Sequence, residues 1–181
     1  ISPGQTLWSR PISEMFMQEN FRQFLDRLRQ NGELVDLHQP VDIRHIATLV
    51  DQSDKALLFH NVVGYAMPVV SGIIRSQARA ILSMGAKTYG DIEVRLRKAI
   101  DNPIAPIMVN TSPTREVTMV GDEVDLFKLP IPMSSIYDGG PMITAGVVIV
   151  KDPELGWNSG IYRFIVKEKN LTGIDIVTPN N

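Results

Sequence analysis

Apolar residues in the first hundred positions recur at helical spacing in several separate segments. Between Asn20 and Gln30 they stand at i, i+3, i+4 and i+7, which predicts an amphipathic helix. Asn20 with Gln23 has the form of a capping box, and Asn31-Gly32 ends the pattern. A second helix is predicted over residues 41–52. Its inward-facing residues are expected to be Ile43, Ile46, Ala47 and Val50.

Two more helices and three short strands complete this region. Ser76 precedes a helical segment that ends at Gly85, and residues 91–100 form another that ends before Asn102-Pro103. Short β-rich runs predict strands at residues 33–37, 56–59 and 68–73. The order of helices and strands is therefore mixed, without a strict βαβ repeat.

From residue 104 onward the pattern changes to β-branched runs separated by Gly, Pro, Asn and Asp. We therefore expect an α+β protein, in which an N-terminal subdomain of helices and strands (residues 1–102) precedes an antiparallel barrel or sandwich (residues 103–181). The predicted strands of the second region are residues 105–110, 115–121, 142–151, 160–168 and 172–178.

Composition and charge narrow the functional classes. The 181 residues are 44% hydrophobic and 21% charged, with a net charge of −2, which gives no general attraction to nucleic acid or anionic membranes. The absence of cysteine excludes disulfides, thiolate metal sites and cysteine nucleophiles, and favours a cytoplasmic location. The first residues lack the pattern of a signal peptide, and the longest uncharged apolar run, residues 142–150, is too short to span a bilayer.

Few short motifs indicate chemistry on their own. The spacing of His38, His45 and His60 fits no metal-binding helix, so structural histidines are the preferred interpretation. Phosphate-loop, dinucleotide-binding and serine-hydrolase motifs are absent. The sequence Asp138-Gly139-Gly140 suits either a tight turn or an anion-binding nest of backbone N–H groups, and we prefer the turn.

A lone arginine, Arg163, interrupts the apolar segment GIYRFIV. A guanidinium buried among apolar neighbours needs an anionic partner, which could be a carboxylate or phosphate ligand. A structural ion pair, for instance with Asp175 on a neighbouring strand, is the alternative. Asn158, five residues earlier, offers an amide oxygen that suits a hard cation. Strand alternation predicts one face with Ile161, Arg163 and Ile165 and another with Tyr162, Phe164 and Val166.

Five segments occur in an order and spacing that resemble a known family. They are GELVDLHQPVD, ALLFHNVVGY, GDEVDLFKLPIP, DGGPMITAGVVIVKDPELG and NSGIYR. Over about residues 21–181 the chain resembles the N-terminal part of the UbiD-like decarboxylases, the family of 3-polyprenyl-4-hydroxybenzoate decarboxylase. The resemblance implies that the strand-rich second half is part of a split β-barrel related to flavin reductases.

The resemblance also implies an activity and its cofactors. Members of this family use prenylated FMN, supplied by a separate flavin prenyltransferase, with a divalent metal such as Mn²⁺ and with K⁺. They catalyse the reversible, non-oxidative decarboxylation of aromatic or α,β-unsaturated acids. For this chain the resemblance implies a small-molecule acid as substrate and a homo-oligomer formed through a region outside the sequence.

Positions that match the family's motif carry implied roles. Asn158 matches the metal ligand of the motif N-x-x-I-Y-R, and Arg163 matches the residue that binds the substrate carboxylate and partners the catalytic acid. Several relatives place a histidine ligand near the end of this region, where the sequence TPNN makes Asn181 a candidate replacement. The positions implied to contact the flavin are Thr144, Ile161, Tyr162, Arg163, Asp175, Ile176, Val177 and Asn180.

The family's remaining functional residues fall beyond the resemblance. Its second metal-ligating acid, its catalytic carboxylic acids and its oligomerisation domain follow this region, so the isolated chain is expected to be inactive. The first hypothesis is the cofactor-side portion of a prenylated-FMN-dependent decarboxylase. The alternative is a non-catalytic split-barrel module that binds flavin phosphate or a partner chain. An ordinary flavin reductase is a weaker variant, because nothing in the sequence indicates a nicotinamide site.

Overall fold

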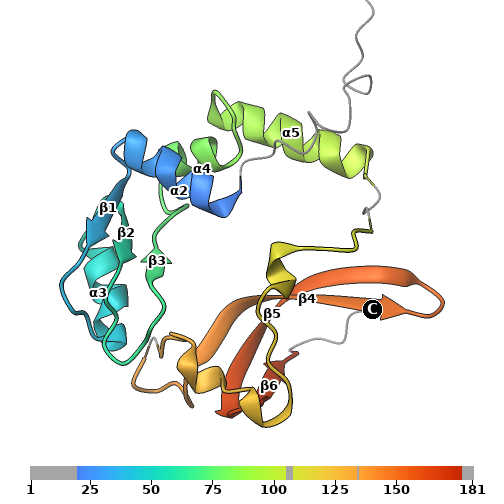
Figure 1. Cartoon of the computed structure of the whole chain (residues 1–181). Coiled ribbons are helices and arrows are strands. Elements are labelled where there is room, and N and C mark those ends of the chain that lie inside the picture. The colour runs from blue at the N-terminus through green and yellow to red at the C-terminus, as the bar shows by residue number, and fades with distance from the viewer. Residues whose placement is uncertain (1–19, 105–107, 134, 177–181) are drawn as a thin grey trace, which may run out of the picture.

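The computed structural model describes residues 20–104, 108–133 and 135–176. An N-terminal group formed by helices α2–α5 and strands β1–β3 is followed by an extended connection and then by strands β4–β6 (Figure 1). The class is α+β, as predicted. In the described residues each group contains one three-stranded sheet, and the C-terminal sheet stays open instead of closing into a barrel.

Helix α2 (Phe21–Gln30) begins at the residue that its sequence predicts. The side chain of Asn20 accepts a hydrogen bond from the backbone N–H of Gln23 at 3.0 Å, and the side chain of Gln23 accepts one from the N–H of Asn20 at 2.9 Å. This capping box satisfies two N–H groups that the helix itself cannot bond. The helix turns the fully buried Leu28 toward the first sheet.

The first sheet is covered by helices on both faces. Strand β1 (Leu34–Leu37) pairs in parallel with β2 (Ala56–Phe59), which pairs antiparallel with β3 (Val69–Ser71). Alternate β2 residues pack in two separate clusters, with Ala56 near α2 and Phe59 near α3 (Ile46–Asp51). The predicted inward position of Ala47 is wrong, because a 3₁₀ turn at residues 43–45 replaces the start of the expected helix and changes the phase that follows.

A buried arginine links helix α4 (Gln77–Ser83) to the sheet. Arg79 is 1% exposed, and its Nη1 donates to the Glu33 carboxylate at 2.8 Å and to the carbonyl of Asp54 at 2.7 Å. The pair therefore joins α4 to the segments that lead into β1 and β2. Helix α5 (Tyr89–Asp101) follows with a capping box at Thr88, and no residue of this helix is buried.

The described residues between 102 and 141 connect the two groups and form no strand. Ser112 accepts a hydrogen bond from the N–H of Thr114 and starts a 3₁₀ turn with Pro113, a residue without an N–H to donate to a ladder. Gly121 has φ +57° and starts another 3₁₀ turn. The predicted strand at 115–121 is therefore wrong, and residues 108–110 of the predicted strand at 105–110 are likewise not a strand.

The second sheet is an antiparallel meander. Strands β4 (Met142–Asp152) and β5 (Gly156–Glu168) form a long hairpin, and β6 (Leu171–Asp175) pairs only with the C-terminal half of β5. The sheet is therefore three-stranded near Ile165 and two-stranded toward the hairpin tip, as Figure 1 shows. Among the described residues, every helix is too short or too polar to cross a bilayer.

Candidate functional site

Strand β5 separates a packed face from an open face. Tyr162 and Phe164 are partly buried and Val166 is 4% exposed, whereas Ile161 is 72% exposed and Arg163 is exposed. The two faces match the predicted alternation of side chains. The expected burial of the guanidinium is wrong, because in the described residues no second layer covers the open face of β5.

Two glycines allow aromatic rings to pack closely on the packed face. A Cβ atom at Gly146 would lie 2.8 Å from the ring of Phe164, and one at Gly160 would lie 2.5 Å from the ring of Tyr162. Both distances are shorter than a Cβ contact allows, so the rings rest directly on the glycine backbones of β4 and β5. Phe164 therefore packs β5 closely against β4, on the face opposite Arg163.

Arg163 and Asp175 lie directly opposite each other across the β5–β6 ladder. Residues in register on antiparallel strands project from the same face, within reach of each other's side chains. Even so, in the described part of the chain Arg163 makes no ion pair, with Asp175 or with any other carboxylate. The structural ion pair considered from the sequence is therefore absent here, and the guanidinium remains available to a ligand.

A groove of about 400 Å³ runs along this open face. Its volume lies in the range of small-molecule sites. Arg163 lies toward one end of the lining strand and Lys167 four residues further on, with Ile165 between them. The remaining lining residues are Met142, Gly173, Ile174 and Asp175.

Gly173 keeps the middle of the groove open. It pairs with Ile165 across the ladder, and a Cβ atom at this position would lie 3.3 Å from Cγ2 of Ile165 and 3.6 Å from Cε of Lys167. On the other side of Ile165, a Cβ at Gly139 would approach its Cδ1 to 3.0 Å. Asp138 accepts a hydrogen bond from the N–H of Ser135, so the Asp-Gly-Gly segment forms a turn packed against β5.

An exposed apolar patch adjoins the Arg163 end of the groove. Ile161 pairs with Val147 on β4, and their exposed fractions are 72% and 68%. Thr144, implied by the resemblance to contact the flavin, is exposed at the irregularity in β4 between Ile143 and Gly146. A flat apolar ring system could rest on this patch with an anionic substituent near Arg163.

The implied metal ligands are not brought together in the described residues. Asn158 lies opposite Val150 near the hairpin tip, and because it is five residues from Arg163 on a regular strand, it projects from the other face. No group of three or more His, Cys, Asp or Glu suited to a metal occurs in the described ranges. Among the implied flavin contacts near the end of the chain, Asp175 and Ile176 are described, and both are exposed. Val177, Asn180 and Asn181 lie outside the described residues.

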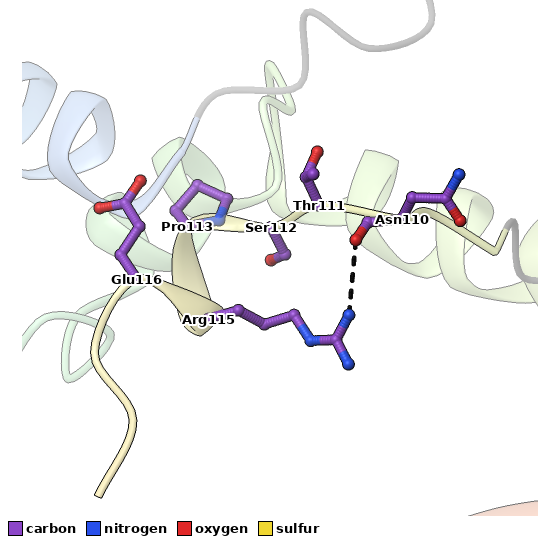
Figure 2. Close-up of a pocket in the computed structure, with 6 residues that line it drawn as sticks. All are labelled: Asn110, Thr111, Ser112, Pro113, Arg115 and Glu116. Carbon is purple, nitrogen blue, oxygen red and sulfur yellow. Dashed lines mark hydrogen bonds between the residues drawn. The ribbon is translucent and has the colours of Figure 1, made fainter.

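A second pocket of about 400 Å³ was not anticipated from the sequence. Figure 2 shows its lining on the connection between the two groups, where Arg115 donates to the carbonyl of Asn110 at 3.4 Å. The pocket forms because residues 110–116 wind around the turn at Ser112-Pro113. Five of its six lining residues are exposed and Ser112 is half-buried, and none of the residues implied by the resemblance contributes to it.

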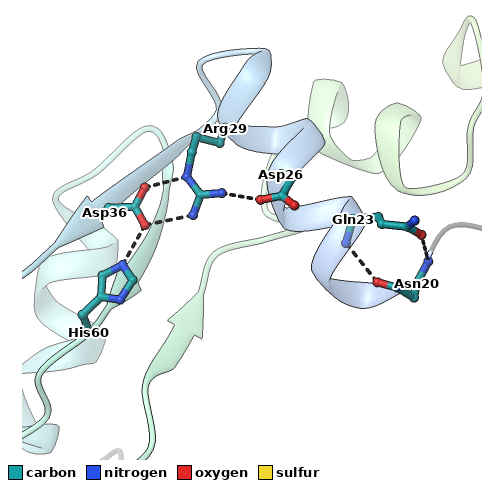
Figure 3. A network of polar contacts seen from close by, with 6 residues as sticks. All are labelled: Asn20, Gln23, Asp26, Arg29, Asp36 and His60. Atoms are coloured by element: carbon teal, nitrogen blue, oxygen red, sulfur yellow. Dashed lines mark hydrogen bonds and ion pairs between the residues drawn. The ribbon is translucent and has the colours of Figure 1, made fainter. Parts of the chain in front are cut away.

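A polar network in the N-terminal group also escaped sequence reasoning. Arg29 donates from Nε and Nη2 to both oxygens of Asp36, and the Nε2 of His60 lies 2.7 Å from the same carboxylate (Figure 3). These hydrogen bonds, that of Arg29 first, hold the pKa of Asp36 well below its usual range. The rings of His60 and His38 are stacked 4.4 Å apart, which agrees with the structural role preferred for the histidines.

Two family descriptions match consecutive parts of this chain. Residues 25–98 match the 3-octaprenyl-4-hydroxybenzoate carboxy-lyase N-terminal domain, and residues 107–181 match the Rift-related domain of the same carboxy-lyase. Together they include both sheets and the groove at Arg163.

Similar proteins include named decarboxylases. The chain is 33% identical to pyrrole-2-carboxylic acid decarboxylase of Pseudomonas aeruginosa, over 88% of this chain and 36% of that protein. It is also 33% identical to anhydromevalonate phosphate decarboxylase of Methanosarcina mazei, over 89% of this chain and 37% of the relative. The chain thus spans little more than a third of the length of these relatives.

A solved structure is similar over the same extent. An evolved dimeric form of the UbiD-class enzyme HmfF from Pelotomaculum thermopropionicum, in complex with prFMN, superposes with a TM-score of 0.81 at 33% identity. The match covers 88% of this chain and 39% of HmfF. The two domain matches, the relatives and the fold all indicate the same family. The chain belongs to the UbiD family of carboxy-lyases and corresponds to the N-terminal portion of its members.

Proposed function

We propose that this chain is the cofactor-side part of a decarboxylase that acts on an aromatic or α,β-unsaturated carboxylic acid with the help of prenylated FMN. The observation that carries the proposal is the guanidinium of Arg163, which makes no ion pair within the described residues and lies between an exposed apolar patch and a groove of small-molecule size. The named relatives that decarboxylate acids, and the relative that contains prFMN, support the same assignment.

The open face of β5 fits a flavin in part. The exposed side chains of Ile161 and Val147 offer a flat apolar surface, and Thr144 lies next to it on β4. Prenylated FMN, when bound, supplies an electron sink for the loss of CO₂. We place its ring system over this patch. Tyr162, Asp175, Ile176, Val177 and Asn180 remain further proposed contacts, as the resemblance implies.

The described residues do not fit a divalent metal by themselves. Asn158 offers one amide oxygen, and a Mn²⁺ ion needs several oxygen or nitrogen ligands around it. Asn158 and Asn181 as ligands of Mn²⁺, and K⁺ as a second ion, therefore remain proposals that require ligands beyond those the structure describes. The role of Arg163 proposed here does not depend on a metal.

Arg163 would bind and orient the substrate carboxylate. A guanidinium presents two parallel N–H donors that match the two oxygens of a carboxylate, which fixes the plane of the acid as well as its position. The aromatic residues that rest on Gly146 and Gly160 hold β5 in place, so the donor is oriented before the acid arrives. The proton donor for the product would come from a carboxylic acid outside this chain.

Several further features of the proposal follow from the resemblance. A flavin prenyltransferase would supply the cofactor, the protein would work in the cytoplasm, and a region beyond this chain would form a homo-oligomer. The boundary between the two proposed domains lies between residues 102 and 103. Reversal of the reaction, carboxylation at high CO₂, belongs to the same proposal.

The first test is to identify the flavin that the protein retains. The chain, and a longer protein that corresponds to the full length of its relatives, would each be co-expressed with a flavin prenyltransferase. The expected result is prenylated FMN, identified by absorbance and by the mass of the released molecule, in the longer protein. Retention of unmodified flavin alone, with no turnover, would favour the alternative of a non-catalytic flavin-binding module. Absence of flavin from both proteins would overturn the proposal.

The second part of the test concerns Arg163 itself. In the longer protein, Arg163→Ala should lower kcat/KM by about 100-fold at equal flavin content, because the acid loses its orienting donor. Arg97→Ala on the exposed surface of α5 is the matched control and should leave kcat/KM unchanged. Normal turnover by the Arg163→Ala variant would contradict the role assigned to this residue.

A further inference from the structure

We infer that the groove on β5 and β6 selects acids that carry a second anionic group, and that Lys167 binds that second group. The inference rests on the proposed function, in which Arg163 binds the first carboxylate. It adds a substrate class, elongated dianionic acids, and a residue that determines specificity.

Lys167 and Arg163 share the open face of one strand. They are four residues apart on β5, so their Cα atoms are separated by at most about 13 Å at the usual rise of a strand, and the β5–β6 register shifts at Lys167. Both line the same groove, and both are exposed. Like Arg163, Lys167 makes no ion pair within the described ranges. Two unpaired cations therefore flank a single cavity.

The part of the groove between the two cations suits a carbon chain. Ile165 and Met142 line it with apolar surface, and Gly173 contributes no side chain. Because a Cβ atom at Gly173 would meet both Ile165 and the stem of Lys167, the glycine keeps a continuous path between the two ends. A ligand with an acidic group at each end of an apolar segment would satisfy both cations and the floor between them.

The charge balance of the groove favours such a ligand. Among the described lining residues Asp175 is the single carboxylate, and it lies opposite Arg163, not beside Lys167. Glu168 is adjacent to Lys167 in sequence, but it does not line the groove. The described part of the lining thus carries two positive charges and one negative charge, and its Lys167 end is the more positive of the two.

A matched pair of acids tests this inference on the chain as it stands. The probes are trans-2-octenoate and trans-2-octenedioate, which differ only by a carboxylate at the far end. Binding would be followed at low salt by amide chemical shifts, with Gly173 as the reporter inside the groove. We expect the diacid to bind about fivefold more tightly, as for a solvent-exposed charge pair. Lys167→Met should remove this preference, and Lys167→Arg should restore it.

The controls separate this inference from the proposed function. Lys169→Met, in the turn between β5 and β6 and outside the groove, should keep the fivefold preference. Equal affinities for the two acids in the unaltered chain, or a preference that survives Lys167→Met, would overturn the role of Lys167. Arg163→Met tests the proposed function instead, because it should weaken the binding of both acids. A monoacid affinity unaffected by Arg163→Met would refute the carboxylate role of Arg163, whatever the behaviour of Lys167.

Discussion

The two halves of the molecule bury their apolar residues very differently. Of the nine buried apolar residues in the described part of the chain, eight lie between Leu28 and Val62, and the ninth is Val166 on β5. The N-terminal sheet is packed by α2 on one face and α3 on the other. The C-terminal sheet exposes large apolar side chains such as Ile161 and Val147.

The contrast suggests that one half of the molecule provides most of its stability and the other half binds the ligands. The N-terminal half has a core, capped helices and a buried ion pair, and none of the residues implied to bind cofactor, metal or substrate lies within it. The C-terminal half contains all of those residues in sequence, and those from Thr144 to Asp175 lie on a sheet that, in the described residues, has an uncovered face. Substitutions in the first half should therefore change the free energy of unfolding, and those on the open face should change ligand binding.

The largest expected effect comes from two matched phenylalanine truncations. Phe59→Ala removes a fully buried ring from the N-terminal core and should lower the free energy of unfolding by about 3–5 kcal/mol. Phe164→Ala removes a partly buried ring that rests on Gly146, and should cost about half as much or less. Urea unfolding followed by circular dichroism measures both. Equal losses would show that the C-terminal sheet is as well packed as the first.

A smaller and pH-dependent effect should come from Asp36. Its pKa is lowered in the folded chain by Arg29 and His60, so its contribution to stability is complete above the unfolded pKa of about 4 and is lost as the pH falls through the folded value. Asp36→Asn should therefore lower the urea midpoint clearly at pH 6, with a difference from the unaltered chain that narrows below about pH 4.

The control for this titration is a carboxylate in the connecting segment. Asp122 makes no ion pair in the described residues, so Asp122→Asn should leave the urea midpoint unchanged at both pH 6 and pH 2.5. A deficit of Asp36→Asn that stays constant from pH 6 to pH 2.5 would mean that the network in Figure 3 acts through packing and not through charge.

The smallest effect on stability, and a clear effect on binding, is expected on the apolar patch. Ile161→Thr and Val147→Thr change exposed side chains, so each should alter the free energy of unfolding by less than about 0.5 kcal/mol. When introduced into the longer protein, both substitutions should reduce the fraction of molecules that retain flavin after co-expression with the prenyltransferase. Val62→Thr, at a 1% exposed position, is the matched control and should lose about 1–3 kcal/mol. Undiminished flavin retention by both patch variants would place the ring system elsewhere.

Local signals in the sequence were sufficient for most of the elements. The predicted caps Asn20 and Ser76 stand at the starts of two helices, and short-range hydrogen bonds of this kind depend only on neighbouring residues. The cap at Thr88 was missed, so the third helix begins at Tyr89, two residues before its predicted start. The predicted strand at 115–121 is wrong. Its β-branched residues favour a strand, but a strand forms only where a second strand pairs with it, and the sequence of one segment does not show whether such a partner is present. The serine-proline turn before it and the glycine at its end bend the chain instead.

The sequence predicted which face of β5 carries Arg163, but not what surrounds that side chain. Alternation correctly separated Arg163 from Tyr162 and Phe164. The sequence also suggested that Asp175 lies on a strand next to Arg163, which the β5–β6 register confirms. The exposure of Arg163 and the groove toward Lys167 depend on which elements cover the sheet, and sequence spacing does not reveal that. The network around Asp36 was missed because the parallel pairing of β1 and β2 brings together residues 24 positions apart.

The contiguous N-terminal core also bears on how this protein is made. Its eight buried apolar residues lie within a single stretch from Leu28 to Val62, and the helices that cover it are complete by Asp101. At about 5–20 residues per second, the ribosome would still need several seconds to synthesise β4–β6 after that point. The first half can therefore reach its native packing while the nascent chain is growing. The uncovered sheet would then emerge beside a folded neighbour, which limits its exposure to other nascent chains.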